Sequence, residues 1–125
     1  MARALKNVDA HAAAKLQKSG ALLVDVRESG EYAQARIPGS QLVSLSRFGM
    51  SELPLAPGQA VVFFCAGGNR TSANATRLAE KAGAADAYVM QGGISAWRQA
   101  GLPVESGSGS NEGTRPGFLS RVFGR

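Results

Sequence analysis

The chain has 125 residues, of which 44% are hydrophobic, and a formal net charge of +5. This length and composition fit one globular domain with a packed core and exclude an intrinsically disordered chain. A single cysteine and a single histidine exclude an intramolecular disulfide, a cysteine zinc site and a histidine metal cluster, so we predict no metal and no other cofactor.

Apolar patterns along residues 1–104 predict strands that alternate with helices. Strands are expected at about 5–8, 21–26, 41–45, 61–64 and 87–90. Helices are expected at about 10–18, 31–35, 73–82 and from 95 onward, with a short irregular helix at about 46–53. The alternation predicts an α/β fold in which helices cover both faces of a mainly parallel sheet. The functional site should then lie in the loops that follow the strands.

Particular residues suggest where the expected elements begin and end. Asp9 and Ser29 are suitable N-caps for the helices that follow them, and Gly83 is a candidate C-cap. Trp97 is expected in the core. His11 is expected on the surface, with a catalytic pairing to the cysteine as the alternative.

The composition changes after residue 104. A Gly/Ser-rich linker and a short basic and apolar tail occupy residues 105–125. We therefore predict a domain at 1–104 followed by a tail at 105–125.

The only cysteine, Cys65, follows the buried strand at 61–64 and precedes a glycine-rich loop that leads into a helix. The thiolate is the nucleophilic form of cysteine. Loop amides and a helix N-terminus favour negative charge, and an arginine adds a fixed cation with a planar fork of donors. We expect these groups to lower the pKa of Cys65 and to hold an anionic substrate. The loop residues are Ala66, Gly67, Gly68, Asn69 and Arg70.

The Cys65-x4-Arg70-Thr71 motif, preceded by a hydrophobic strand, resembles the active-site loop of single-domain rhodanese sulfurtransferases. The resemblance spans about residues 7–104 and includes further motifs in the family's order. These motifs are Leu22-Leu23-Val24-Asp25-Val26-Arg27-Glu28, Glu31-Tyr32, Ile37-Pro38-Gly39-Ser40 and Gln91-Gly92-Gly93-Ile94-Ser95-Ala96-Trp97. The resemblance implies an α/β fold with about five strands.

It also implies a sulfurtransferase that moves sulfane sulfur through a Cys65 persulfide. The donor would be a small anion such as thiosulfate, and the acceptor would be cyanide, a thiol or a sulfur-carrier protein. Because the chain has no second cysteine, the acceptor must come from outside. Two positions depart from the family pattern. Ala35-Arg36 stands where Gly-His is usual, and Ala66 is neutral where many relatives carry a basic residue.

Three supporting residues have two interpretations each. Asp25 and Arg27 either form a pair that fixes the strand end and its loops, or contact the substrate directly. Arg70 either faces the sulfur bound to Cys65, or points to solvent or pairs with an acid such as Asp25.

Two other functions are alternatives to sulfur transfer. One is a rhodanese-fold binding or sulfur-carrier module with little turnover. The other is a cysteine phosphatase, although the C-x5-R loop of those enzymes is one residue longer. The modest positive charge favours small anions or acidic partners. We do not predict nucleic-acid binding, because no basic run interleaved with aromatic residues is present. No run of about 18 apolar residues predicts a transmembrane span, and no apolar signal core is present, so we expect a cytoplasmic protein.

Overall fold

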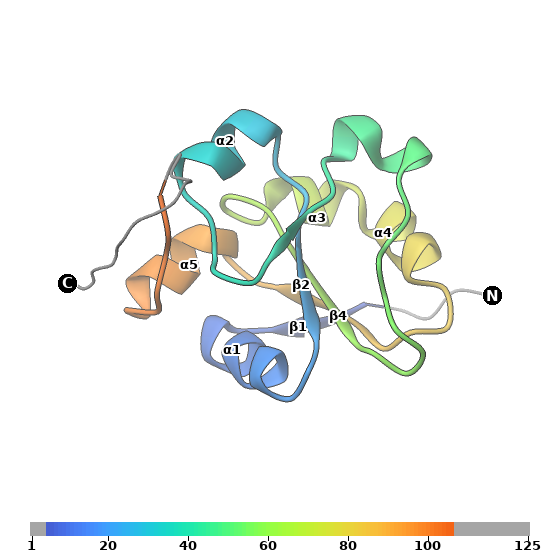
Figure 1. Ribbon diagram of the computed structural model, residues 1–125, viewed down its shortest axis with the longest axis horizontal. Helices are drawn as coiled ribbons and strands as arrows, with labels where there is room; N and C mark the ends of the chain where they lie inside the picture. The colour runs from blue at the N-terminus through green and yellow to red at the C-terminus, as the bar shows by residue number, and fades with distance from the viewer. Residues whose placement is uncertain (1–4, 107–125) are drawn as a thin grey trace.

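A computed structural model describes residues 5–106 of the chain (Figure 1). Five strands form a single sheet in the order β1-β5-β4-β2-β3. Every neighbouring pair in this sheet is parallel. The strands are β1 (Lys6–Val8), β2 (Leu22–Asp25), β3 (Gln41–Leu42), β4 (Val61–Phe64) and β5 (Ala87–Met90).

Helices connect the strands and cover the sheet on both sides, as Figure 1 shows. The helices are α1 (Ala10–Lys18), α2 (Ser29–Gln34), α3 (Asn69–Ala73), α4 (Ala75–Ala82) and α5 (Gly93–Gln99), with a 3-10 helix η1 at Leu45–Met50. The predicted α/β fold, with a parallel sheet of five strands, is confirmed.

Alternate side chains of the central strand β4 enter two separate cores. Val61 and Phe63 pack in the core that also contains Phe48 of η1 and Leu78 of α4. The other two residues of β4 pack in the second core, which includes Ala13 of α1 and Trp97 of α5. All four β4 residues are fully buried, as is usual for a parallel strand covered on both faces.

Several predicted boundaries are confirmed by their local contacts. The Asp9 carboxylate accepts a 2.8 Å hydrogen bond from the Ala12 N–H and caps α1. Gly83 ends α4 with a positive φ of 62°. Trp97 is 2% exposed, and its indole N–H donates to the Pro103 carbonyl over 2.7 Å. His11 is exposed on α1.

Other predicted boundaries were wrong. The chain becomes helical at Asn69 instead of residue 73, and the helical segment is divided into α3 and α4, because Asn74 leaves the helical conformation and its side-chain amide donates to the Arg70 carbonyl over 2.8 Å. The N-cap of α2 is Glu28 instead of Ser29, because Glu28 and Glu31 form a reciprocal capping box. The strand expected at 41–45 stops at Leu42, after which the chain turns into η1.

The end of the described chain is attached to the domain. Glu105, which we expected at the start of the linker, forms an isolated antiparallel bridge with Arg36. Each backbone N–H of the pair donates to the other's carbonyl over 2.8 Å, and the two side chains form an ion pair at 3.2 Å. Residues 107–125, which hold most of the predicted tail, lie outside the described residues. Between residues 5 and 106, no helix has the length and apolar character needed to cross a membrane.

Candidate active site

Cys65 lies directly after β4, at the C-terminal edge of the parallel sheet, and is 1% exposed. The backbone there is held from two sides. The Val26 N–H donates to the Phe64 carbonyl over 3.0 Å, and the Ile94 N–H at the start of α5 donates to the Cys65 carbonyl over 2.9 Å. The position of the sulfur is therefore set by the sheet and by a helix from the end of the domain.

The loop after Cys65 curls so that its amides turn toward the sulfur. The Gly68 N–H donates to the Cys65 sulfur over 3.1 Å. Gly68 has a φ of 106°, which glycine adopts without the strain other residues would suffer. The chain then enters α3, which begins at Asn69. The glycine-rich loop thus makes the turn that brings an N–H donor to the sulfur.

Thr71 adds a side-chain contact to the same sulfur. It is 1% exposed, and its hydroxyl oxygen lies 3.7 Å from the Cys65 sulfur. The hydroxyl also donates to the Gly68 carbonyl over 3.0 Å. Because a hydroxyl both donates and accepts, Thr71 can accept from the thiol or turn to donate to the thiolate.

Burial and hydrogen bonds shift the pKa of Cys65 in opposite directions. Burial raises the pKa of the thiol, because it removes the charged form from water. Hydrogen bonds from the Thr71 backbone and hydroxyl and from the Gly68 and Arg70 backbones lower it by more, so the pKa of Cys65 lies below its ordinary value. The site therefore favours the nucleophilic thiolate.

Gly93 explains why the loop and α5 approach so closely. A β-carbon at Gly93 would lie 2.2 Å from the Cys65 carbonyl oxygen and 2.6 Å from the Ala66 carbonyl oxygen. These same carbonyls accept hydrogen bonds from the N–H groups of Ile94 and Ser95, at 2.9 and 3.1 Å. The carbonyls are thereby turned to α5. The sequence predicted a turn at Gly92 and Gly93, but not this contact.

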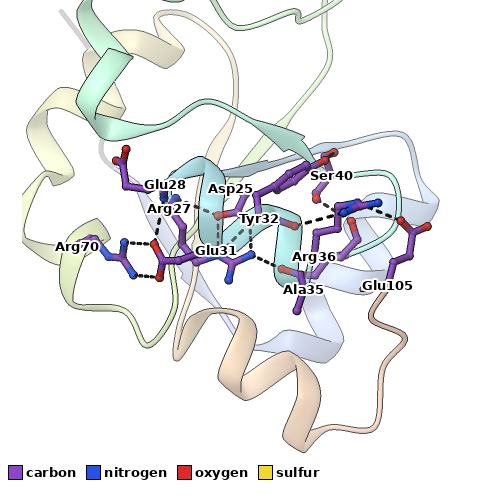
Figure 2. Close-up of polar contacts among 11 residues, drawn as sticks. Asp25, Arg27, Glu28, Glu31, Tyr32, Ala35, Arg36, Ser40, Arg70 and Glu105 are labelled. Atoms are coloured by element: carbon purple, nitrogen blue, oxygen red, sulfur yellow. Dashed lines mark hydrogen bonds and ion pairs between the residues drawn. The ribbon is translucent and has the colours of Figure 1, made fainter. Parts of the chain in front are cut away.

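The Arg70 side chain is directed to Glu31 of α2. Its two terminal nitrogens donate to the two carboxylate oxygens over 2.7 and 2.9 Å, as Figure 2 shows. The two side chains are 37% and 39% exposed. Of the two interpretations of Arg70, the contacts are those of the one in which it pairs with an acid, and that acid is Glu31, whereas Asp25 had been the example named.

The pairing shifts the pKa of both groups. The Arg70 hydrogen bond is the largest cause that lowers the pKa of Glu31 from 4.5 to about 2, against an opposing effect of burial. The Glu28 backbone N–H, which donates to the same carboxylate over 3.1 Å, adds to the lowering. Glu31 in turn raises the pKa of Arg70. Glu31 therefore stays ionised down to a pH of about 2.

Asp25 and Arg27 form a second pair, at the end of β2. The Arg27 guanidinium donates to both oxygens of Asp25, with a shortest distance of 2.7 Å, and also to the Ala35 carbonyl over 2.6 Å (Figure 2). Asp25 is fully buried and Arg27 is 5% exposed. These contacts join the strand end to the end of α2.

The loop predicted as a substrate site is contiguous in the structure, and no role was predicted for Thr71 or Glu31. Thr71 and Glu31 stand in the quoted motifs, so the motifs were the available signal. Of the predicted loop residues, Ala66 is half-buried, and Gly67 and Asn69 are exposed. Within residues 5–106, no group of three or more His, Cys, Asp or Glu residues is arranged to hold a metal ion.

The parallel α/β sheet, with a buried cysteine in the loop after its central strand, places the chain in the class of α/β proteins that carry a cysteine at the C-terminal edge of the sheet. The particular family follows from comparison with known proteins. The model of the rhodanese-like domain matches residues 9–100, and the chain belongs to that family.

Individual relatives agree with this assignment. The thiosulfate sulfurtransferase GlpE of Pseudomonas fluorescens is 33% identical over 110 residues, which cover 86% of this chain and 96% of GlpE. The uncharacterized protein slr1261 of Synechocystis is 40% identical over 88 residues, 70% of this chain, but the match spans only 49% of that relative. The crystal structure of a rhodanese-related protein from Thermoplasma volcanium has a TM-score of 0.69 at 25% identity and covers 80% of this chain and 97% of that one.

Proposed function

We propose that this protein is a sulfurtransferase in which Cys65 carries sulfane sulfur as a persulfide. The observation that carries the proposal is the environment of the sulfur. Cys65 is buried at the end of β4, accepts a 3.1 Å hydrogen bond from the Gly68 N–H, and has a lowered pKa. Membership of the rhodanese-like family and the similarity to GlpE support the same reaction class.

In the first step, the Cys65 thiolate attacks the outer sulfur of the donor. A bond forms between the two sulfurs, the donor's own S–S bond breaks, and the leaving group departs with the electron pair. With thiosulfate as donor, the leaving group is sulfite. The Gly68 N–H and the Thr71 hydroxyl are placed to stabilise the negative charge on sulfur.

In the second step, an external nucleophile attacks the outer sulfur of the persulfide and the Cys65 thiolate leaves. Cyanide would depart as thiocyanate, a thiol as a new persulfide, and a sulfur-carrier protein with the sulfur attached. Because the chain has one cysteine, no second thiol of this chain can form a disulfide with Cys65 and release the outer sulfur as hydrosulfide.

Loop residues 66–70 would act mainly through their backbone. Asp25 and Arg27 would act at a distance, by holding the end of β2 and α2 in place. A cysteine phosphatase remains the alternative that a direct assay separates.

The test is the intact mass of the protein after incubation with thiosulfate or with the persulfide of 2-mercaptoethanol. We expect the wild type to gain about 32 Da, one sulfur atom, and to lose it when cyanide is added, with release of thiocyanate. Cys65→Ser should gain nothing. Absence of the gain with both donors, or hydrolysis of an aryl phosphate that depends on Cys65, would contradict the proposal.

A further inference from the structure

The arginine of the loop that follows Cys65 is bound by a carboxylate of α2. Glu31 receives both terminal nitrogens of Arg70, and its first oxygen also accepts the Glu28 N–H over 3.1 Å. Arg70 and Glu31 keep more than a third of their side-chain surface exposed, which places this pair at the solvent side of the site. Two oxygens and two nitrogens in register make a bidentate pair, the strongest form of this contact.

The second arginine of this region is also committed to a carboxylate. Arg27 binds Asp25 in the buried pair at the end of β2. The residue directly after Cys65, Ala66, is neutral. The two arginines and their two carboxylates therefore sum to no net charge. Hydrogen bonds to the Cys65 sulfur come from groups such as the Gly68 N–H and the Thr71 hydroxyl, which are dipoles and not charges.

Donor charge matters for the transfer step. When a thiolate attacks thiosulfate, the two reactants carry three negative charges in total, and sulfite leaves as a dianion. When it attacks the outer sulfur of a persulfide, the S–S bond breaks, a thiolate RS⁻ leaves, and the total is one or two negative charges, depending on the proton of the donor. Dipoles alone stabilise the smaller charge more readily than the larger, because a highly charged dianion must give up more hydration on entry.

We propose that Glu31 is a specificity-determining residue that neutralises Arg70 and so tunes the site for persulfide donors over the thiosulfate dianion. The inference rests on the proposed sulfur transfer through Cys65. Glu31 acts through Arg70 and is thus a positioning residue. A dianionic donor attracted to Arg70 would have to approach the Glu31 carboxylate or displace it from the guanidinium. A persulfide donor needs only the hydrogen bonds that the Gly68 N–H and the Thr71 hydroxyl give to sulfur.

The test compares kcat/KM for thiosulfate and for the persulfide of 2-mercaptoethanol in the wild type and in Glu31→Gln. Glutamine keeps an oxygen for the Glu28 N–H and one contact to Arg70, but it removes the negative charge. We expect kcat/KM for thiosulfate to rise about three- to fivefold, the effect of a partly exposed charge pair, and the value for the persulfide to change less than about twofold. Glu80→Gln on α4 is the matched control, since it removes the same charge from an exposed position on another helix.

A second variant keeps the test decisive if Glu31→Gln is poorly folded. Glu31→Ala removes the same charge and should shift the ratio of the two donors in the same direction. Ala66→Lys is a positive control for the effect of local charge, because it adds a cation next to Cys65 and leaves the Glu31–Arg70 pair untouched. An unchanged ratio between the two donors in a folded Glu31 variant would overturn the role of Glu31 while leaving sulfur transfer intact. Failure of both donors to load Cys65 would instead overturn the proposed function.

Discussion

Two arginine–carboxylate pairs flank the site, and they differ chiefly in their contact with water. Asp25 and Arg27 have side chains that are 0% and 6% exposed, whereas Arg70 and Glu31 are 37% and 39% exposed. Both pairs have a shortest distance of 2.7 Å. The same chemistry therefore has different consequences, because the cost of leaving a charge unpaired depends on how much water can reach it.

The buried pair is part of the architecture. It joins residues only two positions apart in the sequence, and Arg27 extends the connection to the Ala35 carbonyl at the end of α2. The half-exposed pair connects residues 39 positions apart and reaches from α2 to the loop that surrounds Cys65. We therefore expect loss of the first pair to lower the free energy of unfolding. Loss of the second pair should mainly change the electrostatics of the site.

The largest expected effect is the loss of half of the buried pair. Asp25→Asn leaves the Arg27 guanidinium buried without a counter-charge, and removal of one partner of such a pair costs about 3–5 kcal/mol. Urea unfolding at neutral pH measures this loss as a decrease in the free energy of unfolding. The double variant Asp25→Asn/Arg27→Met is the control, since an apolar side chain of similar size removes the unpaired charge and should recover much of the stability. If Asp25→Asn loses under about 1 kcal/mol, the contrast between the two pairs is lost.

A smaller effect is expected on the pKa of Cys65, and it distinguishes the hydrogen-bond donors of the loop from the Arg70 guanidinium. Thr71→Val keeps the shape but removes the hydroxyl 3.7 Å from the Cys65 sulfur. This contact is among those that lower the pKa of Cys65, so the variant should raise that pKa. The thiolate should lose the stabilisation of one hydrogen bond, about 0.5–1.5 kcal/mol. The rate of iodoacetamide alkylation against pH should show its midpoint at higher pH.

Arg70→Ala is the comparison for that experiment. Its backbone N–H, which contributes to the low pKa of Cys65, is retained, and the lost guanidinium is the one bound to Glu31. We expect the alkylation midpoint to move less in Arg70→Ala than in Thr71→Val. The reverse order would show that the guanidinium charge lowers the pKa of Cys65 more than the Thr71 hydroxyl does.

The smallest effect concerns the stability that the exposed pair contributes. The folded-state pKa of Glu31 is lowered from 4.5 to about 2, so this stabilisation is fully present above about pH 4.5 and is lost as the pH falls through about 2. Because both side chains are more than a third exposed, solvent limits it to at most about 1 kcal/mol. The difference in unfolding free energy between wild type and Glu31→Gln should narrow as the pH is lowered through that window. A difference that stays constant with pH would argue against the ion pair as its source.

The sequence by itself determined the features that depend on neighbouring residues. Four apolar residues at 61–64 indicated the buried strand β4, and Asp9 indicated the start of α1. Cys65 with its glycine-rich loop indicated the candidate site, because strand, thiol and loop are contiguous. The alternation of strands and helices was enough to predict the parallel sheet.

Tertiary structure decided the features in which distant segments compete for the same groups. The sequence does not indicate which acid pairs with Arg70. Only the packing of α2 against the loop selects Glu31 over Asp25. The break at Asn74 and the capping by Glu28 depend on side-chain hydrogen bonds that outweigh helix periodicity. The need for glycine at position 93 is visible only once α5 meets the Cys65 and Ala66 carbonyls, because a β-carbon there would overlap them. Apolar periodicity is a local property of the chain, whereas the choice of partner for a charge or a carbonyl is settled by which groups the fold brings together.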